Sequence, residues 1–211
     1  MSKPLELEKI QINTVAALPL SNNPVSGVRD LFDPETKLLR QRATYWQNQL
    51  DGPLLIYDRK GNIERKFVFK QGKLSGLSEF YRDNNLYARL PFLKGILDGT
   101  AIYYDQGGNR VMDIPFSLGE IEGEMIFYGK MGHVVKIIPY EKGKKQGVAK
   151  SYYASGAVSK TEPYSNNLLE GNVTQYYEDG RVCSWNLYKG GKLLEGPRIF
   201  NHKSQEVFIN R

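Results

Sequence analysis

The sequence predicts an all-β protein, folded as an elongated antiparallel meander of about seven 24-residue β-hairpin repeats. Three observations predict this fold. Glycines recur at intervals of 23 to 25 residues, aromatic residues hold fixed positions after them, and Gly or Asn marks two further positions in each unit. A fixed period of this length is typical of repeat proteins, in which each unit packs against its neighbours.

The period is visible in three stretches of similar sequence. GLSEFYRDNN (76–85), GTAIYYDQGG (99–108) and GEMIFYGKMG (123–132) each begin with Gly and carry an aromatic pair at the fifth and sixth positions. The opening glycines of the units are Gly27, Gly52, Gly76, Gly99, Gly123, Gly147, Gly171 and Gly196. In the two other series Asn replaces Gly at positions 48, 85 and 167. Because Gly and Asn both tolerate a positive φ angle, we expect tight turns at these positions.

Between the turns lie segments of six to ten residues, which are too short for helices and rich in Val, Ile, Tyr and Phe. Each unit therefore indicates a two-stranded hairpin. The first strands carry an aromatic ladder of Tyr57, Tyr81, Tyr104, Tyr128, Tyr152 and Tyr176. The second strands carry Tyr45, Phe69, Phe92, Phe116, Tyr140, Tyr164 and Tyr188. We expect both ladders to stack between units as the core.

Proline precedes four of the second-strand aromatics, at Pro91, Pro115, Pro139 and Pro163. Because proline has no N–H to donate, each is expected to mark a strand end or a bulge. The repeat array is predicted to cover residues 27–200. Residues 1–26 and 201–211 lie outside the pattern and are predicted to cap the open edges of the sheet.

Composition places the chain among folded proteins, with 40% hydrophobic and 25% charged residues. The N-terminal stretch MSKPLELEKIQINTVAALPL carries two glutamates and a short apolar segment, which does not fit a signal peptide. We therefore expect a cytoplasmic protein, or a periplasmic one if a signal peptide has been removed. The single Cys183 excludes an intramolecular disulfide.

No motif for catalysis is present in the sequence. It contains neither a glycine-rich phosphate loop nor a GxSxG nucleophile elbow. His133 and His202 have no partners at metal-ligand spacing, and a lone Cys183 in a strand is typical of a small buried residue. Acidic residues recur just before the opening glycines, which assigns them to the scaffold. We expect no enzyme, no metal, no cofactor and no nucleic-acid partner.

The candidate binding residues are those that differ from a simple repeat. Adjacent residues in a strand point to opposite faces, so the neighbours of the ladder tyrosines are expected to face away from the core. These are Phe80, Tyr103, Phe127, Tyr153 and Tyr177, and Trp185 adds a further aromatic anchor. Such a surface is typical of an interface. The alternative is that sheet twist and the terminal caps bury this face.

Charge is unevenly distributed along the chain. The whole net charge of +6 comes from residues 127–211, with 13 Lys/Arg against 7 Asp/Glu. Its densest cluster contains Lys142, Lys144 and Lys145. This cluster predicts an acidic partner, either a protein or an anionic surface. The alternative is that these lysines serve solubility and edge protection.

The phrases KQGKLSGLSEFY, LLEGNVTQYYEDG and KGGKLLEGPRIF resemble the MORN repeat variant, in the form found in bacterial YwqK-type antitoxins. The better-known eukaryotic MORN pattern, with Trp after YEGE, is not matched. The resemblance covers residues 27–200 and implies a protein that binds and neutralises a toxin. An immunity protein against a secreted bacterial effector, such as a membrane-attacking lipase, belongs to this class.

Three functions of different kinds remain open from the sequence. The first is this toxin-neutralising module with a cognate toxin or effector as its protein partner. The second is a peripheral membrane or scaffold protein that uses its basic C-terminal half on anionic lipid. The third is an enzyme accessory or a hydrolase. A stoichiometric protein partner favours the first function, whereas salt-sensitive liposome binding favours the second.

Overall fold

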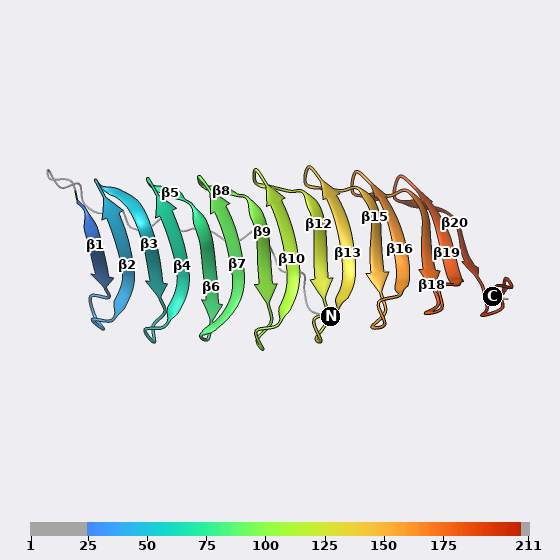
Figure 1. Ribbon diagram of the computed structural model, residues 1–211, viewed down its shortest axis with the longest axis horizontal. Helices are drawn as coiled ribbons and strands as arrows, with labels where there is room; N and C mark the ends of the chain where they lie inside the picture. Colours follow the sequence, from blue (N-terminus) through green and yellow to red (C-terminus); the bar gives the residue numbers. More distant parts are fainter. Residues whose placement is uncertain (1–24, 208–211) are drawn as a thin grey trace.

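The computed structural model describes residues 25–207, which form one long row of strands (Figure 1). The strands of the N-terminal half are β1 (Gly27–Phe32), β2 (Leu39–Trp46), β3 (Gln49–Tyr57), β4 (Ile63–Lys70), β5 (Lys73–Leu74), β6 (Gly76–Arg82), β7 (Asn85–Leu93), β8 (Ile96–Leu97), β9 (Gly99–Tyr104) and β10 (Arg110–Ser117). Those of the C-terminal half are β11 (Glu120–Ile121), β12 (Gly123–Tyr128), β13 (Val134–Glu141), β14 (Lys144–Lys145), β15 (Gly147–Tyr152), β16 (Val158–Ser165), β17 (Leu168–Leu169), β18 (Gly171–Tyr176), β19 (Val182–Lys189) and β20 (Lys192–Ile199).

All twenty strands belong to one antiparallel sheet that does not close on itself. Seven hairpins follow one another along the chain, and β20 adds a final strand. The second strand of each unit pairs with the first strand of the next, for example β4 with β6 and β7 with β9. The predicted all-β meander is confirmed. Within residues 25–207 we find no helix, and hence none that could span a membrane.

The hairpin turns use the predicted Gly and Asn positions. Gln71 and Gly72 have φ values of 50° and 72°, which is the two-residue turn favoured between twisted antiparallel strands. The equivalent residues that follow the second strands of the other units also have positive φ, at Asn48, Gly95, Gly119, Gly143, Asn167 and Gly191. The prediction is wrong at Asn85, because that residue begins β7 and the turn is formed by Asp83 and Asn84.

Each recurring proline packs on the opening glycine of the next unit. Gly99 has a φ of +108°, and a Cβ at this position would lie 3.2 Å from Pro91 Cγ. Glycine therefore meets both a conformational and a steric requirement here. The strand pairing continues through Leu77 and Pro91 without a break, and β7 ends two residues later. The predicted strand end is close, but the bulge lies elsewhere, between Phe80 and Tyr81.

The core lies on one face of the sheet, which we call the core face and define as the side bearing Phe80. Side chains two and four residues after the opening glycines are buried on it, together with alternate residues of the second strands. Its buried apolar residues in the N-terminal half include Ala43, Tyr45, Leu54, Phe67, Phe69, Leu74, Phe80, Ala88, Leu90, Ala101, Tyr103, Met112 and Ile114. Tyr81, Tyr104 and Tyr128 are half-buried on the opposite side, the outer face.

The expectation that both aromatic ladders form the core is therefore wrong. Gly76 pairs with Phe92, and Phe80 pairs with Ala88, four residues from Phe92 on the same strand. Phe92 and Phe80 consequently share a face, and Tyr81 points the other way. The two ladders lie on opposite faces of one sheet, and only the second-strand ladder joins the core.

The predicted end segments are partly outside the described chain. Residues 1–24 of the predicted N-terminal cap and residues 208–211 of the C-terminal cap lie outside the described residues. The C-terminal end of the described chain turns back beside β20, through a bridge between Phe200 and Glu206. Arg198 and Glu206 form an ion pair across this turn, with 2.5 Å between Nη2 and Oε2. The capping role of both segments stays a prediction.

Candidate protein-binding surface

One row of paired residues crosses the core face from unit to unit. Residues whose Cα atoms are directly opposite in neighbouring strands point to the same face. From β6 to β19 the row runs Phe80, Ala88, Tyr103, Met112, Phe127, Lys136, Ser151, Lys160, Gln175 and Ser184. The row is apolar as far as Phe127 in β12 and polar from Lys136 in β13 onward. Before β6 the same row carries Arg65 in β4, Ile56 in β3 and Gln41 in β2. The apolar stretch therefore runs from β6 to β12, and a longer polar stretch begins at β13.

The polar half of the core face centres on Glu162, which is only 9% exposed. Lys136 Nζ lies 2.7 Å from one of its carboxylate oxygens and Lys160 Nζ lies 2.9 Å from the other. Burial by itself would raise the pKa of Glu162, but the hydrogen bonds from these two lysines outweigh it and lower the pKa. Both lysine side chains remain about one-third exposed at the surface. We refer to Lys136, Lys160 and Glu162 as the Glu162 cluster.

Tyrosines line one margin of this polar half. Tyr140 and Tyr164 are half-buried on the core face, and burial raises the pKa of each hydroxyl. Lys145 pairs with Tyr140 across β13 and β14, and its Nζ lies 5.1 Å from the centre of the Tyr164 ring. This distance allows a cation–π interaction. The polar half thus combines cations, amide side chains and aromatic rings on one face.

The three lysines predicted as a patch divide between two places. Lys142 and Lys144 are exposed at the turn between β13 and β14. Lys145 is half-buried and directed over Tyr164, as described above. These three lysines therefore border the polar half of the core face, at the end of the strands where the β13–β14 turn lies.

Phe80 and Tyr103 do not face outward, and their predicted exposure is wrong. Phe80 is 2% exposed and Tyr103 is 3% exposed. The Phe80 ring packs edge-to-face on Phe67 with 5.7 Å between ring centres, and burial raises the pKa of Tyr103 to about 12. Phe127 is half-buried against the same core cluster. The alternation of faces was predicted correctly, but the buried face was chosen wrongly.

Tyr153 and Tyr177 connect neighbouring units. The Tyr153 hydroxyl donates to the carbonyl oxygen of Tyr176 at 2.6 Å, and the Tyr177 hydroxyl donates to that of Phe200 at 2.8 Å. The Tyr177 ring also stacks on the imidazole of His202, with 3.8 Å between ring centres. Both tyrosines are half-buried, and these contacts give them a structural role in holding successive units together.

Trp185 lies on the outer face, away from the other candidates. Its Cα is opposite Thr174 on one side and Arg198 on the other, and the Arg198 guanidinium lies 5.4 Å from the centre of the indole ring. The indole is half-buried. The six aromatic residues predicted as one binding surface are thus distributed over two faces and several units, and the structure does not bring them together.

Charged groups on the outer face of the N-terminal half are neutralised in pairs. Glu79 accepts hydrogen bonds from Lys66 at 3.2 Å and Arg89 at 3.1 Å. Burial would raise the pKa of Glu79, but the bonds from Lys66 and from a tyrosine hydroxyl lower it overall. Asp113 is bound by the Arg110 guanidinium and accepts the Tyr128 hydroxyl at 2.7 Å. These contacts connect strands and leave little free charge.

The acidic residues before the opening glycines cap turns, as a scaffold role predicts. A Glu122 oxygen accepts the N–H of Lys142 at 2.7 Å, and a Glu170 oxygen accepts that of Gly190 at 2.6 Å. Asp51 accepts the N–H of Gln71 at 3.3 Å in the same arrangement. Among the described residues no group of three His, Cys, Asp or Glu side chains has the geometry to hold a metal ion.

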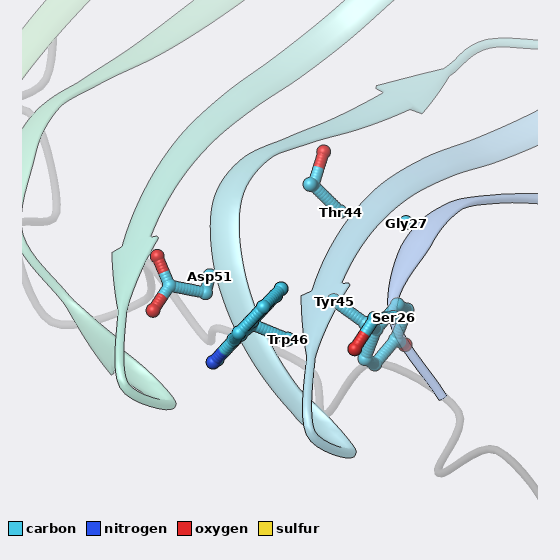
Figure 2. A pocket seen from close by; sticks show the side chains of 6 residues that line it. All are labelled: Ser26, Gly27, Thr44, Tyr45, Trp46 and Asp51. Carbon is cyan, nitrogen blue, oxygen red and sulfur yellow. The ribbon is translucent and has the colours of Figure 1, made fainter. Parts of the chain in front are cut away.

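A hollow beside Trp46 was not predicted from the sequence. Trp46 is 60% exposed at the end of β2, and the hollow next to it measures about 500 Å³ (Figure 2). Its lining residues are Ser26, Gly27, Thr44, Tyr45, Trp46 and Asp51. The signal was present in the sequence, because the equivalent position holds a Lys, Leu, Ser or Glu in the other units. An exposed Trp at a repeat position otherwise filled by smaller or charged residues indicates a contact site.

Comparison with known families identifies one repeat. Residues 145–166, which contain the hairpin of β15 and β16, match the family model described as the MORN repeat variant. The chain contains a MORN repeat variant. The other hairpins of the sheet repeat the same antiparallel pairing between successive strands. The family match itself covers this one repeat.

No curated protein matches the chain. Among solved structures, one match is a mutant of S. aureus TarM in complex with fondaparinux, α-GlcNAc-glycerol and UDP. It has 13% sequence identity and a TM-score of 0.21, and it covers 71% of this chain. The chain corresponds to 21% of the length of that protein. A likeness at this TM-score carries no argument about this protein.

Proposed function

We propose that this protein is a non-catalytic protein-binding module of the antitoxin or immunity type, which neutralises a bacterial toxin or secreted effector by direct contact. The observation that carries the proposal is the change of chemistry along the core face. The repeat positions that hold Phe80 and Tyr103 in the N-terminal half hold Ser151 and Gln175 in the C-terminal half. Because the fold accepts apolar residues at these positions, folding does not require the polar ones, and they are available to a partner.

The Glu162 cluster strengthens this argument. Burying the Glu162 carboxylate costs free energy that its attraction to two partly exposed lysines only partly offsets. The corresponding position in an earlier unit is Ile114, which is fully buried and carries no such cost. A charged cluster kept where an isoleucine fits is best explained by a partner that recognises the charges.

The dimensions of the polar half suit a protein partner. Strands β13, β15, β16, β18 and β19 are spaced by about 4.8 Å, which gives a width of about 20 Å. Strands of eight residues extend for about 26 Å. The resulting surface provides a large part of the roughly 800 Å² that each partner contributes to a standard interface. Its lysine- and tyrosine-bearing composition suits an acidic protein surface.

Binding to any effector or toxin that a neighbouring gene encodes tests this function. We expect a stoichiometric complex by isothermal titration calorimetry. Lys136→Ala together with Lys160→Ala should weaken it at least tenfold, by about 1.4 kcal/mol or more. A matched control is Lys66→Ala, which removes a similar ion pair from the outer face. Absence of a complex would contradict the proposed function, and equal loss in both variants would place the contact elsewhere.

Lys142, Lys144 and Lys145 provide a second test of the same function. Charge steering by exposed lysines raises association rates and makes them depend on salt. Reversal of all three residues to Glu should slow association with the partner and flatten its salt dependence. Unchanged rates at low and moderate salt would show that these lysines serve solubility.

A peripheral membrane role on anionic lipid is the second candidate. It is favoured by the position of the whole net charge of +6 in residues 127–211 and by the exposure of Lys142 and Lys144. Co-sedimentation with vesicles containing phosphatidylserine, at low and high salt, tests it. Salt-sensitive vesicle binding in the absence of a protein partner would favour this role over toxin neutralisation. Localisation in the cytoplasm is part of the first proposal and is tested by cell fractionation.

A further inference from the structure

Six successive junctions, from Gly52 to Gly171, cover the opening glycine in the same way, whereas Gly196 lies against Asn186 and the Trp185 carbonyl. The side chain eight residues before the glycine packs over it from the second strand of the preceding unit. A Cβ on Gly99 would lie 3.2 Å from Pro91, and one on Gly147 would lie 3.3 Å from Pro139. The complete set of covering pairs is Thr44 on Gly52, Val68 on Gly76, Pro91 on Gly99, Pro115 on Gly123, Pro139 on Gly147 and Pro163 on Gly171.

Gly27 lacks this cover among the described residues. A Cβ on Gly27 would meet nothing within 4 Å, although its φ of +99° matches that of the other opening glycines. The hollow beside Trp46 extends over this bare glycine (Figure 2). Strand β1 pairs with β2 alone within residues 25–207, and all six of its residues are exposed. The first unit therefore has a free strand edge and an uncovered glycine at the same place.

The sequence contains a segment before Gly27 that resembles the covering strands of the other junctions. The residue eight positions before Gly27 is Pro19, and the stretch Ala-Ala-Leu-Pro-Leu (16–20) corresponds to Ala-Arg-Leu-Pro-Phe (88–92) of β7. Asn23 stands four residues before Gly27, as Asn48 stands before Gly52. The turn after β2 already makes the same hydrogen bond to the preceding unit as the later turns do. Asn48 donates its N–H to the carbonyl of Val25, as Gly119 donates its N–H to that of Leu97.

We infer that the free edge of β1 and the Gly27 hollow form a docking site for residues 16–20 of this same chain, with Pro19 covering Gly27. Residues 16–20 lie outside the described residues, so the inference rests on the repeat spacing and on the site that receives the segment. The register follows from the other junctions. Arg89 is opposite Ile102 and Ala88 is opposite Tyr103, which places Ala17 opposite Asp30 and Ala16 opposite Leu31.

The chemistry of the segment suits this site. Alternate residues Ala16, Leu18 and Leu20 would share the core face, as Ala88, Leu90 and Phe92 do in β7. A docked strand would satisfy the free N–H and C=O groups of β1, whose exposed edge is otherwise open to aggregation. Proline suits the covering position, because Pro91, Pro115, Pro139 and Pro163 occupy it at four other junctions. A strand from another protein or from a second copy is the competing occupant.

Disulfide trapping in the full-length chain tests the register directly. With Cys183→Ser as background, Ala16→Cys and Leu31→Cys place two thiols on directly opposite residues, at about 5 Å between Cα atoms and within disulfide range. Ala17→Cys with Leu31→Cys is the matched control, because residue 17 points to the other face. We expect rapid intrachain crosslinking in the first pair and little in the control. Equal crosslinking in both pairs, or crosslinks between chains, would overturn the inference.

Hydrogen exchange gives a second readout that does not depend on cysteines. If the segment docks, the β1 amides that do not bond to β2 should exchange at least about tenfold more slowly in the native chain than in the Pro19→Gly variant. Pro24→Gly changes the same segment outside the covering position and should leave that protection in place. Rapid β1 exchange in the native chain, or equal losses in the two variants, would show that residues 16–20 do not occupy this edge.

Discussion

Truncation of Phe80 to alanine tests which face of the sheet is the core. Phe80 is 2% exposed, and its ring lies 5.7 Å from the centre of the Phe67 ring and 6.2 Å from that of Tyr87. Loss of a buried Phe side chain typically costs 3 to 5 kcal/mol, because transfer free energy is lost and a cavity remains. Edge-to-face aromatic contacts account for about 0.5 to 1.5 kcal/mol of such a cost. We expect Phe80→Ala to lower the free energy of unfolding by about 4 kcal/mol.

Tyr81→Ala is the matched variant, because Tyr81 is the next residue on the same strand and points to the outer face. It is half-buried and donates its hydroxyl to Glu79 at 3.1 Å. Loss of this bond and of partial burial should cost roughly 1 to 2 kcal/mol. Urea unfolding followed by fluorescence measures both variants, and Trp46 and Trp185 report on the two ends of the array. Equal losses, or a larger loss for Tyr81→Ala, would refute our assignment of the core face.

Three further predictions concern the repeat junctions and the Glu162 cluster. Gly147→Ala should cost about 2 kcal/mol in thermal or urea unfolding, because φ is +94° and the new methyl group would lie 3.3 Å from Pro139; a neutral result would contradict the packing argument. Tyr153→Phe should cost about 1 kcal/mol by removing the bond to the Tyr176 carbonyl, and an unchanged unfolding midpoint would show that this bond contributes nothing. The folded state lowers the pKa of Glu162 from 4.5, so its stabilising contribution is present above about pH 4.5 and is lost as the pH falls through the folded pKa. Unfolding measured from pH 7 to pH 3 should therefore show a weaker acid destabilisation in Glu162→Gln, and identical pH profiles would argue against the ion pairs.

The repeat length, the strand order and the turns were predictable because each depends on local chemistry. A two-residue turn between antiparallel strands needs positive φ, and Gly or Asn meets that requirement at positions such as 72 and 167. Short segments between such turns leave no room for helices. Strands that follow one another in sequence at this spacing pair with their neighbours, which fixes the meander.

The buried face was not predictable from alternation alone. Phe80 and Tyr81 are both aromatic, and a period of two states that they face opposite ways without stating which one is buried. The decision depends on the pairing register, which places Gly76 opposite Phe92 and so aligns Phe80 with the second-strand ladder. Register results from packing across strands and from the bulge after Phe80, and neither is visible in a single segment.

The polar half of the core face was readable from the sequence once the core positions are known. The residue four positions after the opening glycine is Phe80, Tyr103 and Phe127 in three successive units, then Ser151 and Gln175. This position was predicted to face outward, and its aromatic members were therefore interpreted as the binding surface. When this position is assigned to the core face, its change from aromatic to polar residues favours the C-terminal half as the candidate binding region.

A repeat array can separate folding from recognition along its length. Each unit contacts only its nearest neighbours, so stability is approximately a sum of local contributions. The apolar core of the N-terminal half, with residues such as Leu54, Phe67 and Ile114, supports its own strands and does not depend on the chemistry beyond β12. The C-terminal half keeps buried apolar residues at Ala149 and Val173 and adds the buried Glu162 with its partly exposed lysine Lys136. Charged residues at several positions would destabilise a single globular core, whereas an array of locally packed units tolerates them. This tolerance allows one end of the sheet to carry a charged surface while the other end maintains the fold, as the proposed function requires.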